Sequence, residues 1–348
     1  MEIRDYAQII KLAWRELDGD RHEIKGVFDV SAQVSTNHVY KVSFYKREPV
    51  FAKLSEYGNF EDFREDHIII NNLANNLEYP YQMFLAQSLV KRNELFIYRY
   101  HELNRSAWVV FYNPILIREK LPRRLEEKHI KKLGRELARF HKACTNVSNQ
   151  LPHSSKNVII DIQRLKRSIY KEEIKMCDSH RDMILRHADC FLENADKANY
   201  MTEIETIPVF VDWNIGNFSV TGDGKFYSRW DYDWFRMSSR VMDFYFFSRV
   251  VSDVGDRTVF SYLVDTLMED RFMIFLKEYH RIFPLSVAEV RLIKETYRFF
   301  ILNYVIKDGP YFFRKYYSNK LIKEAYDTYF PAMDANYRVE KILKTLKL

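Results

Sequence analysis

The chain has few cysteines and no long hydrophobic run, and both absences restrict the class of protein. Its 348 residues include only Cys144, Cys177 and Cys190, an odd number without Cys-x-x-Cys spacing. A disulfide framework is therefore excluded and a reducing compartment is expected. No apolar stretch approaches the roughly 20 residues that cross a bilayer, and the charged N-terminus lacks the apolar segment of a signal peptide. These features predict a soluble, cytoplasmic protein.

A strong excess of one charge is also lacking. The chain carries 54 basic and 48 acidic residues, a formal net charge of +6, and the two signs are mixed in most windows. Nucleic-acid binding depends on a concentrated basic surface, so the composition argues against it. A polyanionic small molecule bound at a local basic spot fits the same small excess.

What the chain does contain is enough apolar surface for a large core. Hydrophobic residues make up 47% and aromatic residues 16% of the sequence. A chain of 348 residues exceeds what one core usually serves, so two lobes with a cleft between them are expected. Residues 24–54 alternate apolar and polar side chains in three runs, which predicts three antiparallel strands. Residues 60–76 follow as a helix, and residues 94–103 predict a strand that leaves the sheet.

Helical periodicity dominates the remaining sequence. A single stripe of an amphipathic helix contains Ile130, Leu133, Leu137, Phe140 and His141, which makes His141 a core histidine. Ser286 and Glu289 form a candidate capping box at the start of another helix, which ends at residues 308–310. The predicted fold class is α+β and two-lobed, with a strand-rich lobe at residues 1–100 and a larger helical lobe at residues 101–348.

Glycine is scarce, yet three of the nine glycines fall within residues 209–237: Gly216, Gly222 and Gly224. A short apolar strand ends there at Asp212, Asn217 begins the next strand, and a tight turn returns the chain to Asp231. This hairpin is expected to bring the three side chains together. Carboxylate and amide oxygens suit Mg²⁺, and a carboxylate off the metal can accept a hydroxyl proton. The pattern indicates a phosphoryl-transfer site.

These residues resemble those of the aminoglycoside phosphotransferase and choline kinase family, small-molecule kinases with a protein-kinase-like fold. The family pattern has a catalytic Asp, an Asn five residues later, a metal-binding Asp after a hairpin and a further Asp downstream. Here it is matched by Asp212, Asn217, Asp231 and Asp243. The resemblance covers most of the chain, because Lys53 stands where the ATP lysine is expected and residues 133–143 look like the helix before the catalytic loop.

The resemblance implies a role for each of these residues. Asp212 would accept or orient the substrate hydroxyl, while Asn217 and Asp231 would hold Mg²⁺ across the phosphates of ATP. Lys53 would bind the α- and β-phosphates. An acidic residue of the following helix would steady Lys53, with Glu65 as the first choice and Asp66 as its rival.

Further nucleotide contacts are implied in the strand-rich lobe. Adenine would bind backbone groups of a hinge at residues 96–100, which contains Ile97, Tyr98 and Tyr100. The turn at residues 35–38, with Ser35 and Asn37, would cover the phosphates, although it lacks the glycines of a phosphate loop. Asp243 would pin the catalytic loop. Asp233 is either a second neighbour of the metal or a solvated turn residue, and the second interpretation is preferred.

The main hypothesis is an ATP- and Mg²⁺-dependent phosphotransferase acting on a hydroxyl of an amino alcohol, sugar or antibiotic-like acceptor, without nucleic-acid or membrane partners. Phe210 and Val211 replace the His-Gly that the family usually has before its catalytic Asp. This departure supports an alternative, a pseudokinase-like nucleotide-binding or scaffold protein. A protein kinase proper is disfavoured, because Tyr232 and Asp233 follow Asp231 where that class has Phe-Gly. The charges of the later helices do not identify the acceptor.

Overall fold

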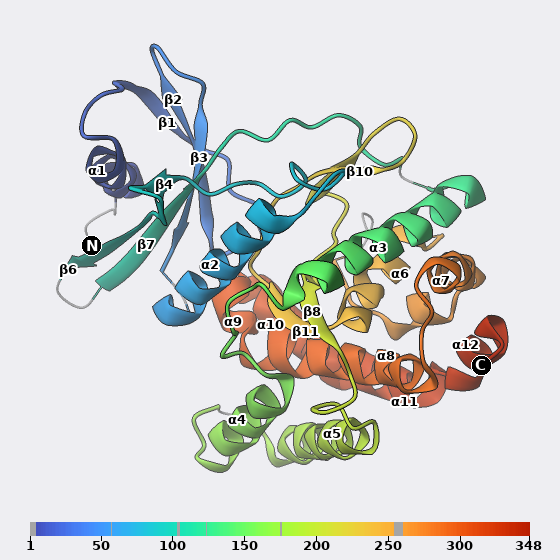
Figure 1. Ribbon diagram of the computed structural model, residues 1–348. Coiled ribbons are helices and arrows are strands. Elements are labelled where there is room, and N and C mark those ends of the chain that lie inside the picture. The colour runs from blue at the N-terminus through green and yellow to red at the C-terminus, as the bar shows by residue number, and fades with distance from the viewer. Residues whose placement is uncertain (1–4, 57, 103–104, 123, 175, 254–259) are drawn as a thin grey trace.

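The strand-rich lobe is built on one antiparallel sheet (Figure 1). The computed structural model describes residues 5–348 except residues 57, 103–104, 123, 175 and 254–259. Five of the described strands pair in the order β1-β2-β3-β7-β6. Their bounds are Ile24–Asp29 for β1, His38–Phe44 for β2, Val50–Ser55 for β3, Ile97–Glu102 for β6 and Arg105–Tyr112 for β7. Strands β1 to β3 and their register confirm the three strands predicted from alternation.

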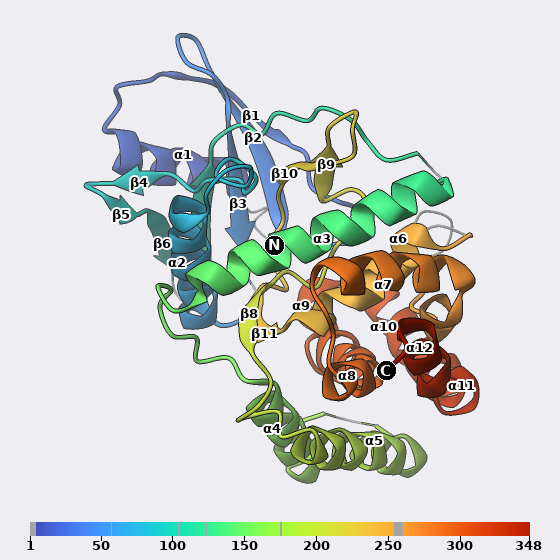
Figure 2. The same cartoon turned by 45° about the vertical axis from the view of Figure 1, so that its right-hand side comes forward.

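Two helices cover the two faces of this sheet. Helix α1 (Tyr6–Asp18) packs its Trp14 against Phe44 and Phe111. Helix α2 (Phe60–Asn76), whose bounds match the prediction, lies between the sheet and the long helix α3 (Figures 1 and 2). Along β7, Phe111 belongs to the core shared with α1, whereas its neighbour Tyr112 belongs to the core that includes α2 and the helical lobe. Strand β7 is therefore covered on both faces, as its continuous apolar sequence requires.

The sheet continues beyond residue 100, where the lobe boundary was expected. Strand β7 pairs with β3 along its length, so the last strand of the sheet ends at Tyr112. Between α2 and β6 the chain forms the short hairpin β4 (Val90–Lys91) and β5 (Glu94–Leu95). The crossing into the helical lobe therefore follows β7 rather than β6.

The helical lobe is organised around α3 (Glu127–Ser148), which packs along α7 (Asp270–Ile282). A Cβ atom at Gly134 would lie 2.4 Å from the backbone oxygen of Phe275, so glycine is required for this close approach. The stripe predicted in this helix is buried, including His141. Helix α8 (Val287–Phe299) begins with the predicted capping box of Ser286 and Glu289.

The other helices complete the lobe around this pair. Their bounds are Val158–Tyr170 for α4, Asp178–Lys197 for α5, Phe244–Val251 for α6, Gly309–Phe312 for α9, Lys315–Glu324 for α10, Phe330–Asn336 for α11 and Val339–Leu346 for α12. Residues Phe300–Lys307 and Ala325–Tyr329 are π-helical, and Arg240–Asp243 and Val264–Met268 are 3₁₀-helical. In the described ranges, none of the helices combines the length and apolar character needed to cross a membrane.

Four short strands interrupt the helices and hold the candidate site. Strand β8 (Thr206–Val209) pairs with β11 (Arg236–Ser239), and β9 (Phe218–Val220) pairs with β10 (Phe226–Arg229). The turn between β9 and β10 closes with a hydrogen bond from Thr221 N to Lys225 O, and Gly224 adopts a φ of +78°. The hairpin predicted from the clustered glycines is therefore present.

Candidate active site

Residues 210–217, here called the Asp212 loop, begin with a strained backbone. Val211 has a φ of +58°, a conformation that costs a β-branched residue about 1–3 kcal/mol. The fully buried Asp243 holds it there, because its Oδ1 accepts hydrogen bonds from the backbone N–H of Phe210 at 3.0 Å and of Val211 at 2.7 Å. The predicted role of Asp243 as the residue that pins this loop is confirmed.

Asp243 is itself fixed by a buried chain of hydrogen bonds. His141 Nε2 lies 3.1 Å from Asp243 Oδ2, and His141 Nδ1 lies 2.8 Å from the Tyr279 hydroxyl. Burial lowers the pKa of His141, although the Asp243 carboxylate opposes this shift. A neutral ring satisfies both contacts if it donates from Nε2 and accepts at Nδ1. The core histidine expected from the sequence thus orients the carboxylate that holds the loop.

Asp212 and Asn217 lie side by side within the loop. The amide Nδ2 of Asn217 donates to Asp212 Oδ2 at 3.0 Å, and the backbone N–H of Asn214 donates to Asp212 Oδ1 at 3.1 Å. The buried Arg229 donates from Nη2 to the backbone oxygen of Asp212 at 2.9 Å, and its guanidinium lies 4.2 Å from the ring centroid of Trp213. Both the carboxylate and the backbone of Asp212 are therefore positioned by neighbours.

A second cluster, here called the lysine site, contains Lys53, Asp231 and Asp233. Lys53 extends from β3, is buried, and places Nζ 3.1 Å from Asp231 Oδ1 and in an ion pair with Asp233 Oδ1. Burial opposes the charge on Lys53, but the two carboxylates outweigh it and raise the pKa of Lys53. Burial also opposes ionisation of Asp231, yet the Lys53 ammonium lowers the pKa of Asp231. The site holds two carboxylates for one ammonium.

A backbone contact connects the lysine site to the Asp212 loop. The N–H of Trp230, the residue before Asp231, donates to the backbone oxygen of Asn217 at 3.0 Å. Asp231 itself has a φ of +66°, so the chain turns sharply at this residue. The contacts therefore run from Asp212 through Asn217 and Trp230 to Asp231 and Lys53, which places all four predicted polar residues along one connected path.

The donor set fits a hard cation only in part. In the described part of the chain, no group of three or more His, Cys, Asp or Glu side chains is arranged to hold a metal ion. Asn217 directs its amide nitrogen at Asp212, so its amide oxygen is the atom that could bind a metal ion. The Asp231 side chain is 41% exposed. One carboxylate and one amide oxygen suit Mg²⁺ when phosphate and water supply the other ligands.

The expected pairing of Lys53 with Glu65 or Asp66 was wrong. Glu65 Oε1 instead accepts from Ser154 Oγ at 2.8 Å and from the N–H of Ser155 at 2.7 Å, while Asp66 pairs with Lys156. Glu65 and Asp66 therefore both contact the segment at residues 154–156, between α3 and α4. Lys53 instead extends toward Asp231 and Asp233 in the segment after β10.

The predicted hinge at Ile97, Tyr98 and Tyr100 was also wrong. These residues belong to β6, at the edge of the sheet, where Ile97 pairs with Val110 and Tyr100 pairs with Ala107. The segment that leaves the sheet begins at Asn113, whose N–H donates to Gln87 O at 3.0 Å. The apolar run of β7 lacks the alternation that identifies a half-exposed strand, so the alternation pattern did not reveal this additional strand.

The β1–β2 loop, residues 30–37, contacts the helical lobe. The N–H of Thr36 donates to Phe312 O at 3.1 Å, and the N–H of Arg314 donates to Val34 O at 3.0 Å. Ser35 forms an isolated antiparallel bridge with Phe313. Asn37 donates from Nδ2 to Asp233 Oδ2 at 2.8 Å. The predicted covering turn thus lies across the space between the lobes next to the lysine site.

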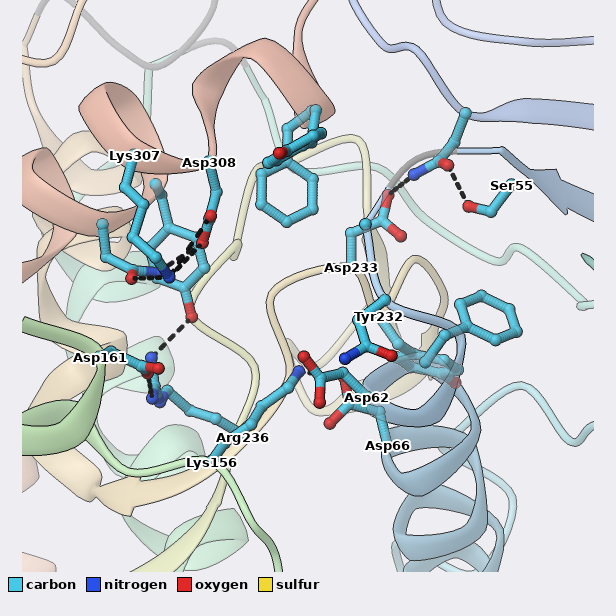
Figure 3. A pocket seen from close by; sticks show the side chains of 18 of the residues that line it. Ser55, Asp62, Asp66, Lys156, Asp161, Tyr232, Asp233, Arg236, Lys307 and Asp308 are labelled. Carbon is cyan, nitrogen blue, oxygen red and sulfur yellow. Dashed lines mark hydrogen bonds and ion pairs between the residues drawn. The ribbon is translucent and has the colours of Figure 1, made fainter. Parts of the chain in front are cut away.

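A cavity of about 380 Å³ opens beside this loop and the lysine site. Figure 3 shows Asp233 and Ser55 on one side and the pairs Asp161 with Arg236 and Lys307 with Asp308 on the other. Lys156 and two carboxylates of α2, Asp62 and Asp66, border it from below in this view. Tyr304, Tyr311 and Phe312 add aromatic surface to the lining. Several of these residues come from or adjoin the π-helical segment Phe300–Lys307, and such segments are frequent at functional sites.

The interpretation of Asp233 as a solvated turn residue was wrong, because its carboxylate is engaged on both oxygens. Burial, opposed by the Lys53 ammonium and reinforced by the Asp231 carboxylate, raises the pKa of Asp233. A sequence signal did exist. The Asp-Tyr-Asp sequence places two carboxylates two residues apart, and both of them reach Lys53 in the structure.

Comparison with known proteins identifies the fold. A scan against protein-family models gave no match, and a search of curated proteins gave none either. Among solved structures, an amicoumacin kinase, hAmiN, in complex with AMP-PNP, Ca²⁺ and Ami is similar with a TM-score of 0.64 at 13% identity, covering 97% of this chain and 95% of that one. A microcompartment-associated aminopropanol kinase gives 0.62 at 14% identity, covering 98% and 99%.

An ADP-bound aminoglycoside phosphotransferase, APH(2'')-Ib, is also similar, with a TM-score of 0.53 at 13% identity and coverage of 92% of this chain and 98% of that chain. The chain has the fold of the aminoglycoside phosphotransferase-like kinases. Both lobes take part in the match, because the aligned regions span nearly the whole chain. The two-lobed α+β architecture predicted from the sequence is confirmed.

Proposed function

We propose that this protein is an ATP- and Mg²⁺-dependent phosphotransferase that moves the γ-phosphoryl group of ATP to a hydroxyl of a small molecule. The observation that carries the proposal is the Asp212 loop, in which Val211 is held in a strained backbone conformation and Asp212 lies beside Asn217. Strained residues of this kind cluster at active sites. The likeness in fold to kinases crystallised with AMP-PNP and ADP supports a nucleotide substrate.

Asp212 is the proposed general base. Phosphoryl transfer needs a group that orients the acceptor hydroxyl and takes its proton as the acceptor oxygen bonds to phosphorus and ADP leaves. The hydrogen bonds from Asn214 and Asn217 fix the plane of the Asp212 carboxylate. A base held in this way needs no reorganisation when the hydroxyl arrives.

Asn217 and Asp231 are the proposed Mg²⁺ ligands, on the strength of their oxygen donors and their connection through Trp230. Bound there, Mg²⁺ would neutralise charge on the phosphate oxygens. Lys53 is the proposed ligand of the α- and β-phosphates, because it is the buried cation next to Asp231. The proposed adenine site is the backbone of residues 113–116, because these residues follow β7 and leave the sheet.

The 380 Å³ cavity is the proposed acceptor site, because Tyr232 and Asp233 of its lining directly follow Asp231. Its charges are largely neutralised in pairs, as in the 2.7 Å contact between Arg236 Nη2 and Asp161 Oδ2. A lining of paired charges and aromatic rings favours a polar acceptor that offers both donors and acceptors of hydrogen bonds. Amino alcohols, sugars and antibiotic-like molecules all meet this description.

The proposal is tested by binding and turnover together. A nucleotide that binds the folded state raises the melting temperature by mass action, so ATP should raise it with Mg²⁺ present and have little effect with a chelator. The Lys53→Ala variant should lose this response while remaining folded. ADP formation is then measured against a panel of amino alcohols, sugars and antibiotics. No thermal response and no ADP formation with any acceptor would contradict the proposal.

A nucleotide-binding protein without turnover is the second candidate, supported by the replacement of His-Gly by Phe210 and Val211. Val211 nevertheless adopts a φ of +58°, a conformation that glycine would reach without strain. Retention of this conformation favours the enzyme. Nucleotide binding with no phosphate release at high protein concentration, whatever the acceptor, would instead favour the second candidate.

A further inference from the structure

Asp233 is held from two directions. Its Oδ1 forms an ion pair with Lys53 Nζ, and its Oδ2 accepts a hydrogen bond from Asn37 Nδ2 at 2.8 Å. The Lys53 side chain is 7% exposed and that of Asp233 is 21% exposed. A buried ammonium requires a counter-charge that stays in place. Asp233 meets this requirement because both of its oxygens are engaged with protein donors.

The support of Asp233 returns to the strand that carries Lys53. The Ser55 hydroxyl donates to Asn37 Oδ1, and the Asn37 N–H donates to Ser35 Oγ at 3.0 Å. Ser55 lies two residues after Lys53 on β3, so both project from the same face of the strand. The contacts from Ser55 through Asn37 and Asp233 to Lys53 therefore form a closed ring, part of which is drawn in Figure 3.

The two carboxylates of α2 that were expected to pair with Lys53 are engaged elsewhere. Glu65 accepts from Ser154 and Ser155, and Asp66 pairs with Lys156. Asp231 contacts Lys53, but its side chain is 41% exposed and it belongs to the proposed metal ligands. Both oxygens of Asp233 are bound by protein side chains, and its side chain is less exposed than that of Asp231.

We propose that Asp233 is the positioning residue of Lys53, in the place where a carboxylate of α2 was expected. This inference rests on the proposed function, because it concerns how Lys53 is presented to the nucleotide phosphates. Asp233 also lines the proposed acceptor cavity, so the residue that orients Lys53 is shared between the two substrate sites.

The test is the dissociation constant of the full-length protein for AMP-PNP with Mg²⁺, measured by titration calorimetry. Asp233→Asn should weaken binding about tenfold, the equivalent of one charged contact. Lys53→Ala should weaken it at least as much, and the double variant should lose little more, because the two side chains act as a unit. Asp233→Glu should restore part of the affinity, and Glu65→Gln should leave it unchanged.

Asn37→Ala gives a second route that changes no charge. It removes the hydrogen bond from Asn37 to Asp233 and should weaken AMP-PNP binding less than Asp233→Asn does. Melting temperatures of all variants identify any that fail to fold, and Asn37→Ala decides the question if Asp233→Asn is among them. If both variants bind as the wild type does, or if Glu65→Gln loses as much, the inference is overturned.

Two further outcomes distinguish failure of this inference from failure of the proposed function. A wild-type protein that binds no AMP-PNP overturns the proposed function and the inference with it. If Asp233→Asn mainly raises the Mg²⁺ concentration needed for half-maximal AMP-PNP binding, and Lys53→Ala does not, then Asp233 is a metal ligand and its positioning role is overturned.

Discussion

The Asp212 loop and the lysine site differ in where their supports originate. The Asp212 loop is held by Asp243, Arg229 and Asn217, all of which belong to the helical lobe. The lysine site joins Lys53 of the sheet to Asp231 and Asp233 of the other lobe. One site is completed within a single core, and the other is completed only while the two lobes stay together.

Under the proposed function, this difference separates the general base from the lysine that binds the nucleotide phosphates. Movement of one lobe relative to the other would part the charges of the lysine site and leave the geometry around Asp212 unchanged. Kinases of two lobes commonly close around their substrates. If the lobes close around substrate, the contacts of the proposed base would stay within one lobe, whereas those of the proposed phosphate ligand would change.

The largest effect is expected from Asp212→Asn. Removal of the proposed base should lower ATP turnover by about 10³-fold, whereas AMP-PNP affinity should stay unchanged because the lysine site is intact. Turnover is measured by coupled ADP release with an acceptor from the panel, and affinity by calorimetry. Loss of affinity alongside turnover would break the separation between the two sites.

Asp243→Ala should act on stability as well. It leaves the N–H groups of Phe210 and Val211 and the ring of His141 without their buried acceptor, at a cost of about 3 kcal/mol in the free energy of unfolding. Urea denaturation measures this loss. Asp243→Asn keeps an acceptor oxygen and should lose less. A stable Asp243→Ala variant with full turnover would contradict the pinning role.

His67 gives a pH-dependent test on the sheet side. Its Nδ1 lies 2.8 Å from Phe63 O and its Nε2 contacts the Tyr112 hydroxyl, so the ring is neutral and buried. Burial lowers the pKa of His67 to about 3, below the ordinary value of 6.5. Stability from the neutral ring is complete above pH 6.5 and is lost as the pH falls toward 3.

Between pH 7 and pH 5 this contribution should fall by about 2 kcal/mol. His67→Gln keeps one donor and one acceptor but does not titrate, so its unfolding free energy should vary less over the same interval. Urea denaturation of both proteins at the two pH values makes the comparison. Parallel pH profiles for the two proteins would show that His67 is not the group responsible.

The smallest effect is expected from Glu65→Gln. The amide oxygen still accepts from Ser154 and Ser155, so the free energy of unfolding should change by less than about 1 kcal/mol. AMP-PNP affinity should not change, because Glu65 does not contact Lys53. A large loss of affinity would return Glu65 to the role first expected for it.

The same contrast explains how far the sequence could be interpreted. The Asp212 loop and the β9–β10 hairpin are set by local spacing, since a strand end, a short loop and a glycine turn fix which side chains meet. Helix α2 and its bounds also follow from local signals, the breaker at Gly58 and the cap at Asn59. The fold class was predictable for this reason, whereas the pinning role of Asp243 was implied by the family resemblance.

The partner of Lys53 was not predictable, because a long-range ion pair depends on which of several nearby carboxylates the tertiary packing brings closest. Glu65, Asp66 and Asp233 all carry a carboxylate, so the sequence does not distinguish them as partners of Lys53. Only the position of residues 154–156 against α2 pairs Glu65 and Asp66 with other groups. Strand β7 was not predicted, for a different reason. Its burial on both faces removed the alternation by which a strand is recognised, and the expected hinge shifted with it.

The main-chain hydrogen bonds between the β1–β2 loop and residues 312–314 have a consequence for how the protein responds to ionic strength. Dissolved salt screens ion pairs that reach solvent but has little effect on neutral peptide hydrogen bonds. Raising the salt concentration should therefore weaken the hold of Asp231 on Lys53 while the loop stays attached across the cavity. We expect nucleotide affinity to change with salt before the space offered to the acceptor does.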